Sequence, residues 1–151
     1  MKDTISQSRL LTLHPKVRDD FKLFIEEAEK GLDIKLRITS ALRSFAIQEE
    51  LYSQGRTKKG KIITNAKPGS SFHNYGLAVD LVRMDGANAD WSFDLSKLLP
   101  YADKYGIDWG GNWKKFKDYP HFEKTLGNTW KSLLSKYNAK KFIPGTDYIA
   151  L

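Results

Sequence analysis

The sequence predicts an α+β fold in which helices flank a small, mainly antiparallel sheet. Segments with apolar residues at helical spacing alternate along the chain with short segments in which apolar and polar residues alternate. Glycine, proline and aspartate turn signals separate these segments. The 151 residues contain no repeat and no linker between domains. We therefore expect a single domain over 1–151 that is large enough to bury a core.

The first predicted helix follows Pro15, a residue that suits the first turn of a helix. Apolar residues then recur at helical spacing, at Val17, Phe21, Phe24, Ile25, Ala28 and Leu32. Gly31 stands where a helix would stop, so the pattern predicts an amphipathic helix with one buried face. His14, directly before it, is interpreted as a structural residue.

Residues 34–39 alternate between apolar and polar and predict a half-buried strand. Ser44 is placed to cap a second helix over 45–54, which Gly55 would end. Residues 56–70 are polar, basic and glycine-containing, and we predict a long loop there. Long loops in compact domains are frequently functional.

Residues 76–82 predict a second strand whose two faces differ in character. One face carries an apolar set that belongs in the core: Leu77, Val79 and Leu81. The other carries Gly76, Ala78 and Asp80. The two small residues leave room for a ligand to approach the Asp80 carboxylate. Asp85-Gly86 then marks a turn.

The last third of the chain predicts further short elements. Residues 93–105 have helical spacing with Gly106 as a stop, although Pro100 would disturb a helix interior. We also predict two short strands, over 107–109 and 121–123. A final amphipathic helix is predicted over 126–137, and the tail over 138–151 has no strong pattern.

The composition restricts the chemistry that the chain can perform. There are no cysteines, so a zinc site would have to use histidine, aspartate or glutamate. The net charge of +7 favours anionic partners such as nucleic acid, an anionic membrane surface or an acidic wall polymer. Basic residues concentrate at 56–61 and 114–117, where an ordinary solvated surface is an equally good interpretation.

The first residues lack the apolar run of a secretory signal, and no stretch approaches the roughly 20 apolar residues that span a bilayer. We therefore expect a protein made in the cytoplasm without a transmembrane segment. If it acts outside that compartment, another factor must release it.

His73 and Asp80 stand seven residues apart, and His121 is the other plausible metal-binding histidine. Two imidazoles and a carboxylate commonly hold catalytic zinc with one position left open. Asp118 is near enough in sequence to His121 to act as a base there, and Arg43 could stabilise a developing oxyanion. Structural roles remain open for each: a turn cap for Asp80, a strand histidine for His121, a surface charge for Arg43.

Several motifs occur together in a characteristic order. They are Ser71-x-His73-x-x-Gly76-x-Ala78-x-Asp80, Asp118-x-x-His121-Phe122, the segment 39–44 with Gln48, and Trp109-Gly110-Gly111-Asn112-Trp113. Over about residues 13–123 the chain resembles the zinc peptidases of the D-alanyl-D-alanine carboxypeptidase family. That family includes vancomycin-resistance dipeptidases and L-alanyl-D-glutamate endopeptidases of phage lysis and wall turnover. Residues 124–151 lie outside the resemblance.

The resemblance implies a hedgehog-like and D-alanyl-D-alanine-peptidase-like zinc fold with one catalytic Zn²⁺. Its ligands would be His73, Asp80 and His121. Asp118 would be the general base and Arg43 would steady the carbonyl oxygen. Three further residues would contact substrate: Ser71, Gln48 and Trp109. An aspartate at the base position and the Trp-Gly-Gly segment are similar to the endopeptidase branch, whereas Ala41 departs from the glycine of many relatives.

The leading hypothesis is a monomeric zinc peptidase that cuts the L-alanyl-D-glutamate bond of the peptidoglycan stem peptide. A D-alanyl-D-alanine carboxypeptidase is the alternative enzyme, and a zinc-containing binding domain of the same fold is the alternative non-enzyme. The presence of Asp118 and Arg43 argues against a pure binding domain. No nucleic-acid partner is expected, because the aromatic residues follow helix-core spacing and are not interleaved with basic ones. We expect action on the bacterial cell wall after release by a phage pore-forming partner; the alternative is a cytosolic enzyme that recycles or trims wall fragments.

Overall fold

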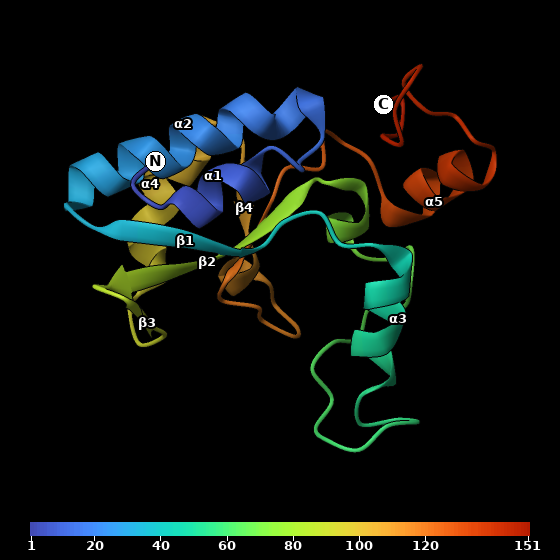
Figure 1. Cartoon of the computed structure of the whole chain (residues 1–151), viewed down its shortest axis with the longest axis horizontal. Helices are drawn as coiled ribbons and strands as arrows, with labels where there is room; N and C mark the ends of the chain where they lie inside the picture. Colours follow the sequence, from blue (N-terminus) through green and yellow to red (C-terminus); the bar gives the residue numbers. More distant parts are fainter.

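The computed structural model describes residues 1–151 and confirms the α+β class: a five-stranded antiparallel sheet carries helices on one face (Figure 1). The helices α1, α2 and α4 pack over the sheet, and α3 stands apart with the loop that follows it (Figure 1). No helix has the length and apolar character needed to cross a membrane. The α-helices are α1 (Thr4–Leu10), α2 (Pro15–Leu32), α3 (Phe45–Ser53), α4 (Leu99–Lys104) and α5 (Trp130–Asn138).

The sheet has the order β1-β2-β5-β4, and the short β3 also pairs with β2. Its strands are β1 (Lys35–Ser40), β2 (Ala78–Asp85), β3 (Asn88–Asp90), β4 (Asp108–Trp109) and β5 (His121–Glu123). Three 3₁₀ turns complete the chain: η1 (Phe72–Tyr75), η2 (Leu95–Leu98) and η3 (Gly110–Asn112). The strand predictions at 34–39, 107–109 and 121–123 are confirmed to within a residue or so at each end.

The core lies between α2 and the sheet. The apolar face predicted for α2 is buried except at Leu32, which is partly buried. Val79 and Leu81 of β2, and Leu77 just before it, are also buried, as predicted. Phe24 of α2 packs against Phe122 of β5 with ring centroids 5.3 Å apart. Because β2 and β5 bury one face in this way, the alternate residues of both strands point to the opposite face. That opposite face carries the candidate site.

The helix α2 ends differently from the prediction. Gly31 lies within the helix, and Asp33 takes the left-handed conformation that ends it, with φ of 51°. Aspartate tolerates this conformation better than most residues because its short polar side chain can bond locally. Gly31 packs closely against Tyr101, since a Cβ atom there would overlap the Tyr101 hydroxyl group unless that side chain moved.

Two other element boundaries were predicted wrongly. Leu126 has a φ of 52° and stays outside α5, which begins after the Thr129 side chain accepts a hydrogen bond from the Ser132 amide. The predicted helix over 93–105 divides into η2 and α4, with Pro100 in the first turn of α4. Proline is tolerated there because the first-turn amide has no partner within the helix.

Gly76 is not part of β2, contrary to the prediction. It ends η1 with a φ of 71°, and a Cβ atom there would lie 2.7 Å from the His14 amide nitrogen. Glycine is therefore required both for the left-handed conformation and for the close approach. The turn delivers the chain from His73 into the strand that carries Asp80.

His14 has the structural role predicted for it. Its Nδ1 accepts a hydrogen bond from the Lys16 amide at 3.1 Å, so Nε2 carries the proton and donates to the Ile149 carbonyl at 2.8 Å. Burial lowers the pKa of this imidazole, which favours the neutral ring that these bonds require. The C-terminal tail, predicted to lack a pattern, is thereby fastened to the start of α2.

Candidate metal centre

The strand register brings Asp80 and His121 together. Asp80 of β2 pairs directly with His121 of β5, so both side chains leave the same face of the sheet. His73 reaches them from η1, where the Ser71 side chain accepts a hydrogen bond from the His73 amide at 3.2 Å. This 3₁₀ turn is itself held by the Arg43 amide, which donates to the His73 carbonyl at 2.9 Å.

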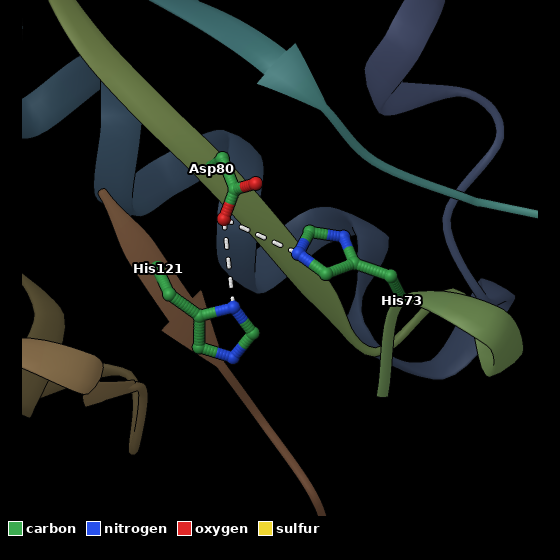
Figure 2. Close-up of side chains that lie close together, drawn as sticks. All are labelled: His73, Asp80 and His121. Atoms are coloured by element: carbon green, nitrogen blue, oxygen red, sulfur yellow. Dashed lines mark hydrogen bonds and ion pairs between the residues drawn. The ribbon is translucent and has the colours of Figure 1, made fainter. Parts of the chain in front are cut away.

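Figure 2 shows both imidazole rings directed at one oxygen of Asp80. His73 Nε2 lies 3.2 Å from Asp80 Oδ1, and His121 Nδ1 lies 3.5 Å from the same oxygen. One donor atom from each of the three residues falls within 4.8 Å of the others. This spacing suits a single metal ion, since ligand atoms about 2.0–2.2 Å from zinc lie roughly 3–4 Å apart.

In each ring the nitrogen that points away from Asp80 also has a hydrogen-bond partner. These partners show whether the three residues are arranged as metal ligands. His73 Nδ1 lies 2.8 Å from the Ala41 carbonyl, and His121 Nε2 lies 2.8 Å from Glu123 Oε1. Each far nitrogen therefore donates, so the near nitrogen of each ring is the atom that can bind a metal ion once it carries no proton. Metal-binding histidines are oriented in this way by acceptors behind them. The residues present fit a zinc ion.

The charges in the cluster are strongly coupled. Burial opposes ionisation of Asp80, but hydrogen bonds from His121 and His73 outweigh it and hold the Asp80 pKa far below its usual range. Burial would lower the pKa of His121, but Asp80 and Glu123 together raise that pKa to about 9. In the metal-free protein His121 thus carries a proton at neutral pH, at the position where a metal would bind.

Zinc affinity should therefore increase with pH. Below pH about 9 a proton on His121 competes with the metal, and above that pH the competition ends. We expect the affinity of the metal-free protein to increase by up to about tenfold per pH unit between pH 6 and 9 and then to level off. Titration against a chromophoric chelator at several pH values measures this; an affinity independent of pH would contradict it.

Arg43 lies at the edge of the cluster and is held by neighbours. Its Nη2 is 3.6 Å from Asp80 Oδ2, and its Nη1 donates to Gln48 Oε1 at 3.0 Å. Gln48 in turn donates to the Ala66 carbonyl at 2.9 Å. Burial lowers the pKa of Arg43 and the charge of Asp80 opposes that change. Arginine stays charged under all ordinary conditions, so a fixed cation faces the site.

Asp118 lies beside His121, with Oδ2 4.0 Å from His121 Nδ1 and about half of its side chain exposed. Burial and the negative charge of Asp80 raise the pKa of Asp118 in the metal-free protein. The Asp118 amide donates to the Gly110 carbonyl at 3.1 Å. A Cβ atom on Gly110 would overlap the Asp118 carbonyl oxygen, so the Trp-Gly-Gly segment permits the approach that places Asp118.

A cavity of about 770 Å³ opens over the cluster. Its lining includes Arg43, Ser71, His73, Asp80, Asp118 and His121. Of the expected substrate contacts, Ser71 lines this cavity. Gln48 is fully buried and does not line the cavity, but it bonds to two residues that do, Arg43 and Ala66. Trp109 lies outside it: its indole is buried against Phe122, and its N–H donates to the Tyr119 carbonyl at 2.6 Å.

Two residues at the site were missed from the sequence. Trp113 lines the cavity, with its ring centroid 5.1 Å from that of His121. Glu123 accepts the hydrogen bond that orients His121. Residues two apart on a strand share a face, so the pair His121 and Glu123 was in principle detectable from the sequence.

Replacing Glu123 with alanine is expected to weaken zinc binding by about 10–100-fold, because His121 loses the acceptor that orients its ring. Glutamine retains an acceptor oxygen and should restore most of the affinity. Competition with a chromophoric chelator measures both variants. Equal zinc affinity in the alanine variant and the parent protein would contradict this role for Glu123.

Comparisons with known proteins agree with this geometry. A family model described as D-alanyl-D-alanine carboxypeptidase, of peptidase family M15, matches residues 64–124. Peptidoglycan L-alanyl-D-glutamate endopeptidase CwlK of Bacillus subtilis is 46% identical over 123 residues, which cover 74% of this chain and 72% of the relative. The L-alanyl-D-glutamate peptidase of Listeria phage A118 is 33% identical over 89 residues, 53% of this chain and 31% of the relative.

Solved structures share the fold. The L-Ala D-Glu endopeptidase ChiX of Serratia marcescens superposes with a TM-score of 0.62 at 25% identity, over 82% of this chain and 88% of that one. A zinc complex of the vancomycin-resistance D,D-pentapeptidase VanY superposes with a TM-score of 0.52 at 13% identity, over 82% and 78% of the chains, which shows the fold alone. By its likeness to CwlK over nearly three quarters of both proteins, the chain belongs to the D-alanyl-D-alanine carboxypeptidase family of zinc-dependent peptidases, M15.

Proposed function

We propose that this protein is a zinc peptidase that hydrolyses the L-alanyl-D-glutamate bond of the peptidoglycan stem peptide. The observation that carries the proposal is the convergence of His73, Asp80 and His121 on one point, with Asp118 and Arg43 over the same cavity. The choice of bond is supported by CwlK, whose name gives that activity and which is 46% identical to this chain.

We assign zinc binding to His73 Nε2, the Asp80 carboxylate and His121 Nδ1. A zinc ion there would supply Lewis acidity, activating a water molecule and polarising the scissile carbonyl. His73 and His121 must be neutral to bind it, and the Ala41 carbonyl and Glu123 hold their remaining protons on the far side.

Asp118 is the general base in this proposal. Its carboxylate lies 4.0 Å from His121 Nδ1 and half-exposed to the cavity, so it can accept a proton from the attacking water. The protonated carboxyl then donates to the leaving amine of glutamate. The balance is simple: water adds across the amide, the carbonyl carbon gains a hydroxyl group, and the nitrogen gains a proton.

Arg43 stabilises the negative charge that develops on the carbonyl oxygen. Its hydrogen bonds to Gln48 and Ser40, both at 3.0 Å, fix the guanidinium before substrate arrives. A cation that needs no reorganisation is more effective than one that must move. Gln48 is thus assigned a positioning role through Arg43.

The cleavage test uses purified peptidoglycan with and without a chelator, followed by mass spectrometry of the new ends. A new free amine on D-glutamate, lost with chelator and restored by zinc, is the expected result. Release of D-alanine would instead indicate a D-alanyl-D-alanine carboxypeptidase, the activity for which the matching family model is described. Absence of any zinc-dependent product would contradict both activities.

The likeness to a phage peptidase supports a lytic role, in which the protein acts as a monomer on the cell wall after a pore-forming partner releases it. Expression in a bacterial host with and without a pore-forming protein tests this. Lysis that requires both proteins is the expected result. Lysis by the peptidase alone would remove the need for such a partner.

A further inference from the structure

A second cavity, of about 190 Å³, lies beside the metal centre at a gap in the sheet. Arg83 of β2 pairs with β1 and β3, and Asp80 pairs with β1 and β5. A strand has two edges, so β3 and β5 both occupy the edge opposite β1. Val82 falls between their pairing regions and lines the cavity. The gap lies between the stretch of β2 that pairs with β5 and the stretch that pairs with β3.

The gap adjoins the catalytic cavity. Asp118 and His121 line the large cavity, whereas Tyr119 and Pro120, which lie between them in sequence, line the small one. Val82 is also two residues from Asp80 on the same strand, a distance of roughly 7 Å. A ligand in the small cavity would therefore begin about two residue lengths from Asp80, next to Tyr119 and Pro120.

The lining of this cavity is aromatic with fixed charges beside it. We name it the aromatic groove; its lining includes Trp91, Phe93, Trp109, Tyr119, Arg83 and Asp90. Trp91 is 64% exposed and Tyr119 is 56% exposed, although large aromatic side chains are usually buried. Arg83 and Asp90 form a salt bridge of 3.0 Å, which holds both polar groups in place.

This combination suits a sugar ring. A pyranose presents apolar C–H faces that pack on aromatic rings, and hydroxyl and amide groups at its edges that bond to planar charged side chains. A volume of about 190 Å³ is of the size of one such ring and is too small for a folded peptide segment. The groove has too few open charges to suit an anionic polymer.

The substrate's own connectivity places a sugar close to the cleaved bond; this step rests on the proposed function. In peptidoglycan the alanine nitrogen is joined through a lactyl group to an N-acetylated amino sugar. The lactyl group is about one residue long, so the ring begins roughly 7 Å from the scissile carbon. On the other side of the bond the stem peptide carries carboxylates, and the lining of the large cavity includes the cationic side chain of Lys117.

We propose that the aromatic groove binds the N-acetylated amino sugar to which the stem peptide is attached, while the acidic peptide occupies the large cavity. Trp91 is the residue in the groove that can be changed with least effect on folding, because it is largely exposed. It would act as a stacking platform for the sugar and would take no part in the chemical step.

The test compares two substrates that share the same tripeptide, L-alanine, D-glutamate and a diamino acid. One carries the lactyl-linked amino sugar on its alanine nitrogen, and the other carries an acetyl group there. With Trp91→Ala, kcat/KM for the sugar-linked substrate should decrease roughly tenfold, the effect expected of one lost aromatic contact, while the acetylated peptide should be cleaved as before. Trp91→Phe keeps a ring and should recover most of the loss.

Trp130→Ala is the matched control, since Trp130 is also partly exposed but lies on α5 and lines neither cavity. Equal losses on both substrates, or no loss with Trp91→Ala, would overturn the sugar site and leave the proposed function standing. Equal cleavage of both substrates by the parent protein would overturn the sugar site in the same way. If the parent protein cleaves neither substrate, the proposed function fails and the sugar site fails with it.

Discussion

Replacement of Asp118 with asparagine is expected to lower kcat by about 10²–10⁴-fold while zinc stays bound. Asparagine has nearly the same shape but cannot accept the proton of the attacking water. The side chain lies 4.0 Å from the nearest nitrogen of His121, too far for a hydrogen bond, and the far side of the His121 ring is held by Glu123. The metal site should therefore survive the change.

The decisive measurement is the activity of the Asp118→Asn protein per bound zinc ion. Kinetics on the isolated stem peptide give the activity, and metal analysis of the same sample gives the zinc content. Asp103→Asn, an exposed aspartate on α4 away from both cavities, serves as the matched control and should leave kcat unchanged. Loss of zinc from the Asp118→Asn protein would mean that Asp118 is a ligand. Retention of full activity would mean that another group accepts the proton.

Because the pKa of Asp118 is raised, we expect the activity to fall at low pH. Burial and the charge of Asp80 raise this pKa in the metal-free protein, so the carboxylate takes up a proton at a higher pH than an ordinary aspartate. The base function is present above that pKa and is lost as the pH falls through it. A bound cation would counter part of the shift by favouring the ionised form.

Much of the fold was predictable because its long elements obey simple periods. The spacing of apolar residues identified α2, and alternation identified β1 and the core face of β2. The errors fall where a local signal depends on tertiary packing. Gly31 signals a helix end, but it lies inside α2 and packs against Tyr101, which is 70 residues away in sequence.

The sequence motifs indicated the residues that the structure brings together as candidate metal ligands, but not the aromatic residues beside them. The strand register brings Asp80 and His121 together, and a residue motif can indicate such a pair. It cannot distinguish Trp109 from Trp113, because the 3₁₀ turn between them sends one indole into the core and the other toward His121. The sugar-binding proposal also depends on a gap between β3 and β5 that no sequence pattern indicates.

The three histidines of this chain permit a direct separation of metal binding from folding. His73→Ala removes a proposed zinc ligand whose ring is held by the Ala41 carbonyl. Loss of a residue that only orients a ligand, such as Glu123, lowers zinc affinity by about 10–100-fold. We expect His73→Ala to lower the affinity by more than this and to abolish the zinc-dependent activity. Metal content after dialysis and cleavage of the stem peptide measure the two effects.

His14→Ala is the counterpart that should behave in the opposite way. It removes a buried ring that bonds to the Lys16 amide and the Ile149 carbonyl and makes no bond to the cluster. The free energy of unfolding should decrease by about 1–3 kcal/mol because two buried polar groups lose their partner. Zinc content and kcat per folded molecule should not change. If His14→Ala lost its zinc, or His73→Ala kept it, the assignment of ligands would have to be revised, since only one of these rings points at the Asp80 carboxylate.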